Sequence, residues 1–410
     1  METRGRIVVV GAGPGGMAAT LALLKAGFDV TLLERAAEIR AAGNILNLWP
    51  PPQKVLRLIG VDTDDLGAPC HSTFRNAKGR LRADVRLSPE VEHEFGGGFI
   101  GLLRWGLYKR MIDAIPAQTL KLGHEVESLE DRGGSVTVHV AGRDPIETDV
   151  VVGADGLHSI VRKHLWGDQP IRHQNLHLVG GWLYDKRGSE GEGVISHNST
   201  TQVSYTPIRH HGRWGYEWWV LEAFDRKQPP PEDLKAFCRD RAREFPPFVN
   251  ELIEATPLDN MQRWEIRDRP PLRRWSKGRI TLVGDAAHPT SPYAAYGAGM
   301  SIEDGYFLAH ELAQVDVRDT PAVRGALQAF EERRKPHTAE VTETAYRIGR
   351  IFHHAPRSLR PLRDLVFDRT PFLQRMIGEK MPDHICSQLA EIDAVAATFR
   401  RPAKRDTVIA

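Results

Sequence analysis

Three glycines near the start of the chain are the first residues whose spacing indicates a ligand. Gly11, Gly13 and Gly16 form a G-x-G-x-x-G motif directly after an apolar run at residues 7–10. In a strand–turn–helix unit the first glycine permits a tight turn, the second lets the backbone approach a pyrophosphate, and the third lets helix and strand pack closely. The following helix presents free N–H groups and the positive end of its dipole to the phosphates. The motif therefore predicts a bound dinucleotide.

The residues around the glycines support this prediction. Residues 17–25 have the pattern of a helix that Gly27 ends, and residues 29–33 have the pattern of a second buried strand. Glu34 closes this strand about 20 residues after the motif, where an acid accepts hydrogen bonds from a ribose hydroxyl. The motif does not distinguish FAD from NAD.

A second strand–turn–helix pattern occupies residues 149–165. Residues 150–152 predict a short buried strand, and a helix predicted over 159–165 follows the turn at Asp155-Gly156. Ser159 and Arg162 are three residues apart on that helix, so they share a face. The pattern also fits an ordinary strand–turn–helix with Arg162 on a solvated face, and these residues alone do not decide between the two interpretations.

The stretch GDAAHPTSPYAAYGAG, residues 284–299, consists mostly of small residues and follows a predicted strand at 280–283. Its prolines fix the backbone, which argues against a flexible loop. Small side chains on a fixed backbone predict the close approach of a large flat ligand. We expect a helix to begin near Gly299. Glu303 and Asp304 would then lie in its first turn, where acids suit the helix dipole.

These three motifs, in this order, resemble those of the FAD-dependent aromatic hydroxylases, the group A flavoprotein monooxygenases related to para-hydroxybenzoate and salicylate hydroxylases. The glycine motif matches their pyrophosphate loop, and Gly284-Asp285 matches their GD motif. Asp155-Gly156 matches their DG motif, which serves FAD and the nicotinamide coenzyme together. The resemblance implies an α/β fold with a Rossmann-like FAD-binding domain, an antiparallel-sheet substrate domain and a C-terminal helical segment.

The resemblance also implies how the chain is divided. The expected FAD-binding domain is discontinuous and covers residues 1–70, 96–175 and 268–350. The substrate-binding sheet is expected over residues 71–95 and 176–267. The C-terminal helical segment is expected over residues 351–410.

Matching positions carry the family's roles over to this chain. The residues expected to bind FAD are Gly11, Gly13, Gly16, Glu34, Arg35, Arg40, Arg104, Asp155, Arg162, Asp285, Gly297, Ala298, Gly299 and Met300. The residues expected at the reacting face of the flavin are Pro292, Tyr296 and Gly297. A helix that begins here would bring N–H groups to the pyrimidine edge of the flavin, where negative charge gathers on reduction. We expect His288 to be structural, because the family does not use it as a base.

One departure from the family pattern concerns Tyr296. Many relatives have Gly-Gln-Gly where Ala295-Tyr296-Gly297 stand here. Tyr296 is either a tolerated surface substitution or part of a particular subfamily's pocket, so the resemblance does not transfer a substrate class. Aromatic residues in the strand-rich middle of the chain either form core or line that pocket. The candidates for substrate contact are Trp182, Tyr205, Trp218 and Tyr293.

The resemblance implies a reaction in which NADPH or NADH reduces FAD and molecular oxygen then gives a flavin C4a-hydroperoxide. This species would hydroxylate a small aromatic or polycyclic, natural-product-like substrate. Residues 284–299 would protect it, because they are poor in ionisable groups and exclude water. The alternatives on the same fold are a halogenase, an epoxidase or a reductase, although WGYEWWVL lacks the Trp-x-Trp-x-Ile-Pro motif of flavin halogenases. A flavin-binding regulatory module is an alternative from a different class.

Composition narrows the range of partners. The 410 residues include 55 basic and 53 acidic side chains, a balance that gives no support for a nucleic-acid partner. The 3 cysteines are far apart, which predicts reduced thiols and no metal site. We find no secretory signal and no run of about 18 apolar residues, so we expect a cytoplasmic protein without an integral membrane segment. The basic, proline-interrupted segment after Ala355 favours short packed helices or a homodimer contact over a peripheral membrane helix.

Overall fold

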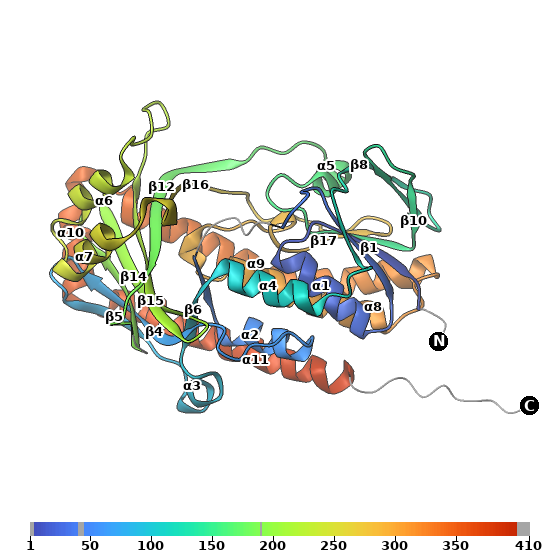
Figure 1. The fold of residues 1–410 in the computed structure, drawn as a ribbon, viewed down its shortest axis with the longest axis horizontal. Helices are drawn as coiled ribbons and strands as arrows, with labels where there is room; N and C mark the ends of the chain where they lie inside the picture. Colours follow the sequence, from blue (N-terminus) through green and yellow to red (C-terminus); the bar gives the residue numbers. More distant parts are fainter. Residues whose placement is uncertain (1–3, 40–44, 189–190, 400–410) are drawn as a thin grey trace, which may run out of the picture.

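A parallel five-stranded sheet carries the N-terminal glycine motif in the computed structural model, which describes residues 4–39, 45–188 and 191–399 (Figure 1). The strands lie in the order β17-β11-β1-β2-β7, and every pairing is parallel. They are short and apolar, as expected where both faces of a sheet are covered. Their bounds are β1 Arg6–Val10, β2 Asp29–Glu34, β7 Leu120–Leu122, β11 Val150–Gly153 and β17 Ile280–Leu282. This is the Rossmann-like α/β unit that the sequence predicted.

Two helices of this unit approach each other almost to backbone contact. The helices associated with the parallel sheet are α1 (Pro14–Lys25), α4 (Arg104–Ala114), α5 (Ile160–Trp166), α8 (Gly297–Ala313) and α9 (Thr320–His353). A Cβ at Gly305 of α8 would lie 2.3 Å from the backbone nitrogen of Ala19 in α1. One at Gly15 would lie 3.1 Å from Ser301 Cβ. Small residues therefore let α1 and α8 pack closely against each other, as Figure 1 shows for the two helices as a whole.

A second, larger sheet has nine strands in the order β16-β12-β15-β14-β13-β4-β6-β3, with β5 paired to β4. Its pairings are antiparallel except for β13 with β4, which is parallel. Their bounds are β3 Ile45–Leu48, β4 Ala68–Asn76, β5 Leu81–Val85, β6 Phe99–Leu103, β12 Arg172–Tyr184, β13 Gly191–His197, β14 Thr201–His210, β15 Arg213–Ala223 and β16 Met261–Asp268. A small antiparallel sheet contains β8 (Val126–Asp131), β9 (Val136–Val140) and β10 (Ile146–Thr148).

The remaining helices lie beside the large sheet or run along the molecule, and α11 packs against α2 (Figure 1). They are α2 (Pro50–Leu58), α3 (Pro89–Phe95), α6 (Leu234–Ala242), α7 (Pro247–Ala255), α10 (Arg360–Arg369) and α11 (Lys380–Phe399). Short turns are η1 (Leu258–Asn260), η2 (Gly284–Ala286), η3 (Pro292–Ala294), η4 (Arg357–Leu359) and the π-helical η5 (Gln374–Glu379). Among the described residues, we find no helix with the length and apolar character needed to cross a bilayer.

Strand alternation gives the large sheet two different faces. One face, which includes Val203, Trp218 and Val220, packs in a core with residues of α6 and α7. The other face, which we call the inner face, includes Trp219 and packs in a cluster with Tyr293 of the 284–299 stretch. The inner face is therefore the one that meets the small-residue stretch.

The large sheet crosses the segment boundaries that the sequence suggested. Strands β3 and β6 lie wholly within segments assigned to the FAD-binding domain, and β4 and β12 begin within them. Strands join a sheet by backbone pairing across any distance in sequence, so the local pattern does not reveal which sheet a short strand enters. The division of the chain into three structural units stays a prediction.

Candidate active site

The glycine motif forms a turn that leaves its backbone open. Gly11 has a φ of 101°, a left-handed conformation that favours glycine. A Cβ at Gly16 would lie 1.9 Å from the Gly11 carbonyl oxygen, so no side chain fits there. A Cβ at Gly13 would have no atom within 4 Å, and no side chain of the described residues caps α1. This open helix N-terminus fits the pyrophosphate of the predicted dinucleotide.

Three predicted FAD-binding residues from distant segments lie around one tyrosine. Burial raises the pKa of the Tyr108 hydroxyl. The charge of Arg104 opposes this pKa shift, and the charges of Asp285 and Glu34 add to it, so all three act electrostatically on the Tyr108 hydroxyl. Glu34 also accepts a hydrogen bond from the Ala12 backbone N–H at 2.9 Å. The sequence reasoning missed Tyr108, whose signal is its spacing of four residues from Arg104, the first residue of α4.

The Asp285 side chain is reached by solvent although protein atoms surround it. Its side chain is exposed to solvent. Burial nevertheless raises the pKa of its carboxyl, against the opposing charges of His288 and Arg104. Both observations are explained if Asp285 lines a deep cleft, where a ligand hydroxyl could donate to it. Of the other predicted FAD-binding residues, Arg35 is exposed and Arg40 lies outside the described residues.

Helix α8 begins earlier than the sequence suggested. It starts at Gly297, so the prediction that Glu303 and Asp304 occupy its first turn is wrong. Within the described part of the chain, no side chain caps the turn from Gly297 to Met300. Ala295, just before it, has a φ of 47°, which is strained for a residue with a Cβ. Uncapped N–H groups at this end of the helix fit the negatively charged edge of a reduced flavin.

The side chain of Tyr296 is buried among the helices. It is 4% exposed, its hydroxyl donates to Glu303, and its ring lies edge-on to His337 with 5.8 Å between centroids. The interpretation of Tyr296 as a tolerated surface substitution is therefore wrong. Pro292, in contrast, is exposed. The Tyr296 side chain therefore lies in the interior and the Pro292 side chain at the surface, and a role for either at the flavin stays a prediction.

A fully buried cluster of charges anchors the small-residue stretch. Arg334 of α9 donates to Glu303 at 2.8 Å and to Asp304 at 2.9 Å. The second oxygen of Asp304 accepts the Gly284 backbone N–H at 2.9 Å and contacts His288 Nε2 at 2.5 Å. Burial alone would raise the pKa of Asp304, but the charges of His288 and Arg334 lower it to about 2. The sequence reasoning missed Arg334, although two acids inside an apolar helix signal a buried cation.

Asp155 and Arg162 both make structural hydrogen bonds, the first within its own turn and the second to a distant segment. The Asp155 carboxylate accepts from Ser159 Oγ at 2.5 Å and from the Ile160 backbone N–H at 2.7 Å. Arg162 donates to the carbonyl oxygens of Ala286 and Ala287, at 3.1 Å each. It is 3% exposed, so the interpretation that placed it on a solvated face is wrong. Arg162 instead ties α5 to the small-residue stretch.

A family model described as an FAD binding domain matches residues 4–345 of this chain. The protein belongs to this FAD-binding family. It is 30% identical over 376 residues to 3-amino-4-hydroxybenzoate 2-monooxygenase of Streptomyces platensis, covering 88% of this chain and 92% of that protein. It is 29% identical over 371 residues to 6-hydroxynicotinate 3-monooxygenase of Pseudomonas fluorescens, covering 86% and 91%. The protein is accordingly an FAD-dependent monooxygenase that uses NAD(P)H and molecular oxygen.

Solved structures share the fold of this monooxygenase. Klebsiella pneumoniae HpxO, in complex with FAD and uric acid, matches with a TM-score of 0.80 at 25% identity, over 93% of this chain and 97% of that one. A salicylate hydroxylase in a substrate complex matches with a TM-score of 0.75 at 18% identity, over 98% and 99%. These likenesses confirm the predicted fold class. The names of the sequence relatives favour oxygen insertion over halogenation or simple reduction.

The aromatic candidates for substrate contact divide between the two faces of the large sheet. Trp218 donates from its indole nitrogen to Thr256 Oγ1 at 2.8 Å, and the Tyr205 ring lies 5.0 Å from that of Phe248. Both face α6 and α7, so the structure does not bring them to the small-residue stretch. Trp182 and Tyr293 belong to the inner-face side. Adjacent strand residues point to opposite faces, and the sequence pattern did not show which face meets the stretch.

We expect Arg334→Met to lower the free energy of unfolding of the monooxygenase by about 3–5 kcal/mol, because it leaves two buried carboxylates without their cation. The neighbouring Arg333→Met is a matched control. Its partly exposed guanidinium pairs with Glu311 and Glu391, and its loss should cost about 1 kcal/mol or less. Urea unfolding of both variants measures the difference. Equal costs would contradict the anchoring role of the buried cluster.

Proposed function

We propose that the monooxygenase hydroxylates a small aromatic ring held between the 284–299 stretch and the inner face of the large sheet. The observation that supports this best is that Asp285, the open α1 N-terminus and the uncapped α8 N-terminus belong to one packed unit, with the inner face against the same stretch. Several of the relatives are named for single substituted rings, hydroxybenzoates and hydroxynicotinate. A ring of this size is therefore the expected substrate.

The residues proposed to hold FAD are those of the glycine motif, Glu34, Arg104, Asp285 and the first turn of α8. When bound and reduced, FAD would supply the electrons that activate molecular oxygen for insertion into the ring. The chain contributes a wall with few ionisable groups, because Ala286, Ala287 and Ala294 carry no polar side chain and pack into the cores behind it. His288 is held by Asp304 and is therefore proposed to be structural.

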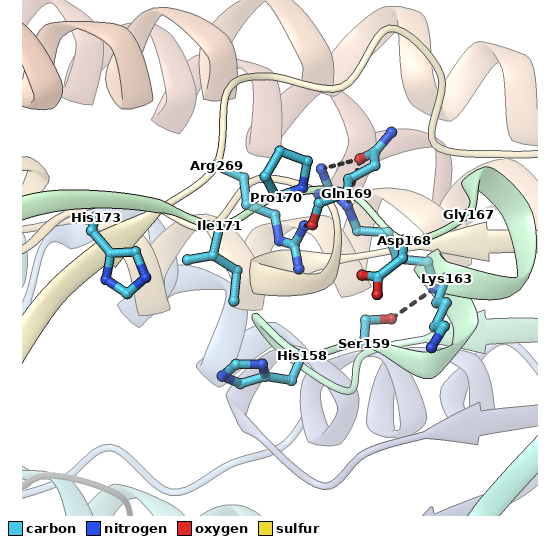
Figure 2. Close-up of a pocket in the computed structure, with 11 residues that line it drawn as sticks. His158, Ser159, Lys163, Gly167, Asp168, Gln169, Pro170, Ile171, His173 and Arg269 are labelled. Carbon is cyan, nitrogen blue, oxygen red and sulfur yellow. Dashed lines mark hydrogen bonds between the residues drawn. The ribbon is translucent and has the colours of Figure 1, made fainter.

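A pocket beside α5 is the proposed coenzyme site. It has a volume of 390 Å³, and Figure 2 shows Lys163, Asp168 and Arg269 among its lining side chains. Arg269 donates to the carbonyl oxygens of Leu157 and Gln169, and Arg162 is occupied by the small-residue stretch. Lys163 is exposed. We therefore propose that Lys163, rather than Arg162, meets a coenzyme phosphate.

The cytoplasmic location and the homodimer contact expected from the sequence stay predictions. Exposed apolar side chains in and beside α10 support a contact with another surface. They are Leu359, Leu362, Leu365 and Phe372.

The proposed function is tested by screening substituted monocyclic aromatics for stimulation of NAD(P)H oxidation by the FAD-loaded enzyme. We expect at least one ring with a hydroxyl or amino substituent to accelerate oxidation and to yield a product heavier by one oxygen atom. Mass spectrometry of the product separates oxygen insertion from uncoupled oxidation. Stimulation without any oxygenated product from the whole panel would contradict hydroxylation.

Asp285→Ala should weaken FAD binding by about 10- to 150-fold, since a hydrogen bond to a charged group contributes about 1.5–3 kcal/mol. Titration of flavin-free protein with FAD measures the affinity. Asp113→Ala provides the control, because Asp113 pairs only with Lys109 on an exposed side of α4 among the described residues. FAD affinity equal in the two variants would remove Asp285 from the site.

Lys163→Ala should raise the coenzyme concentration for half-maximal flavin reduction by about fivefold, which corresponds to about 1 kcal/mol of lost phosphate binding. The FAD content should stay that of the wild type. Anaerobic stopped-flow reduction with NADH and NADPH gives both values, and Lys109→Ala serves as the control. Unchanged half-saturation with either coenzyme would show that the coenzyme binds elsewhere.

A further inference from the structure

A buried glutamate on the inner face of the large sheet has no structural partner for one of its oxygens. Glu217 lies on β15, opposite Trp182 of β12 and Thr206 of β14. It alternates with Trp218, which faces α6 and α7, so Glu217 points to the inner face together with Trp219. Glu217 is only 1% exposed.

Only one oxygen of the Glu217 carboxyl group accepts a hydrogen bond from the protein. The Leu46 backbone N–H donates one hydrogen bond to it, and Oε2 has no hydrogen-bond partner. No lysine, arginine or histidine of the described residues forms an ion pair with Glu217. Burial therefore raises the pKa of the Glu217 carboxyl well above its usual range. A carboxyl left in this state costs stability unless something else donates to it.

Two other unpartnered polar atoms lie on the same face. Asn47 follows Leu46 on β3, and its side-chain oxygen has no partner. Asn47 is paired with Gly101 of β6, where a Cβ would lie 2.8 Å from the Thr206 methyl group. The Ser204 hydroxyl, two residues from Thr206 on β14, also has no partner. The sheet curls at this point, so that polar groups from β3, β14 and β15 converge.

Two histidines lie on this side of the sheet, and burial lowers the pKa of both. Burial lowers the pKa of His197 well below its usual range and that of His353 to about 3. His353 is also hydrogen-bonded to the Tyr293 hydroxyl. The charges of Arg82 and Arg363 also lower the pKa of His197. These two arginines are paired with Asp368 and Asp364, and no ion pair among the described residues includes Glu217. A substrate carboxylate could be held here only while the Glu217 carboxyl keeps its proton and donates it. An O–H or N–H group of the substrate instead donates to Glu217 and favours the ionised form of its carboxyl.

On the basis of the proposed function, we propose that Glu217 binds the substrate through Oε2 by accepting a hydrogen bond from an O–H or N–H group of the ring. The preferred substrates are then hydroxylated or aminated aromatic rings that carry no carboxylate. This separates the protein from relatives named for benzoates and nicotinates. Glu217 would be a specificity-determining residue.

The test compares 3-aminophenol with 3-hydroxybenzoate, two rings that differ mainly in a donor and a carboxylate. Binding to the FAD-loaded enzyme is measured by the change in flavin absorption on titration. Wild type should bind 3-aminophenol at least about tenfold more tightly. Glu217→Gln replaces one acceptor oxygen with a donor, so it should weaken 3-aminophenol binding by about 10- to 150-fold. The difference in affinity between 3-aminophenol and 3-hydroxybenzoate should become smaller in this variant.

Glu222→Gln is the matched control, because it makes the same change on the same strand but on the opposite face. Glu222 is paired with Arg241 and His177, so its variant should have a lower Tm and an unchanged ligand preference. Glu217→Gln should have a Tm equal to or above that of wild type, because the carboxyl serves a ligand rather than the fold.

Three results would overturn the proposal. They are a lowered Tm for Glu217→Gln, no wild-type preference for 3-aminophenol (including failure to bind it at all), and a preference that Glu217→Gln leaves unchanged. If 3-hydroxybenzoate is oxygenated under these conditions, the proposed function stands and the role of Glu217 fails. If no aromatic ring is oxygenated, the proposed function itself fails.

Discussion

The fold depends on one buried cation, Arg334, which holds two carboxylates of α8 and through them the stretch before that helix. Charges taken out of water are costly, and they persist only when every one of them is paired. Glu303 and Asp304 have side chains that are 0% exposed, as has Arg334. Because Asp304 also binds the Gly284 N–H and His288, the cluster determines the path of the chain from Gly284 to the start of α8.

The path of that stretch positions the rest of the site. Glu303 accepts from Tyr296 and so buries the one bulky residue that would otherwise stand before the α8 N-terminus. Arg162 holds the carbonyl oxygens of Ala286 and Ala287 from the other side. Trp49 holds the strained turn at Ala295. The small side chains of this stretch can therefore form a rigid surface, because the anchoring groups lie behind it.

The large sheet forms the opposite wall of the proposed substrate site. Because side chains alternate between its two faces, one face packs in the core and the other faces the substrate. Trp218 fills the core against α6 and α7, while its neighbours Glu217 and Trp219 belong to the inner face. A core side chain and a recognition side chain thus stand next to each other in sequence. The unpartnered Oε2 of Glu217 is a local cost to stability that a hydrogen bond from a substrate would remove.

The sequence was sufficient where function depends on local geometry. Gly11, Gly13 and Gly16 act within one turn, so their spacing alone predicted the open helix N-terminus. It was insufficient where partners lie far apart. In the sequence, Glu303 and Asp304 fit acids at the start of a helix as well as they fit partners of a buried cation. Only the fold brings Arg334 to them.

The same limit applies to strands and side-chain directions. Nothing in the residues of β3 and β6 distinguishes a strand of the large sheet from one of the parallel sheet. Likewise, the pattern of β15 does not say whether Trp218 or Trp219 meets the stretch. The sequence suggested that Arg162 lies on the surface or binds the coenzyme. It could not show the actual partners, which are backbone carbonyl oxygens of a distant segment.

Hydrogen exchange with and without FAD tests the central claim most directly, namely that the buried cluster builds the flavin site before the flavin arrives. In flavin-free protein we expect the Gly284 amide, which is bonded to Asp304, to exchange slowly. Adding FAD should then slow exchange at Gly13 and at Gly297 to Gly299, whose N–H groups no side chain caps within the described residues. A Gly284 amide that exchanges as fast as an unstructured one until FAD is added would contradict the account, as would FAD binding that leaves the α8 N-terminus unprotected.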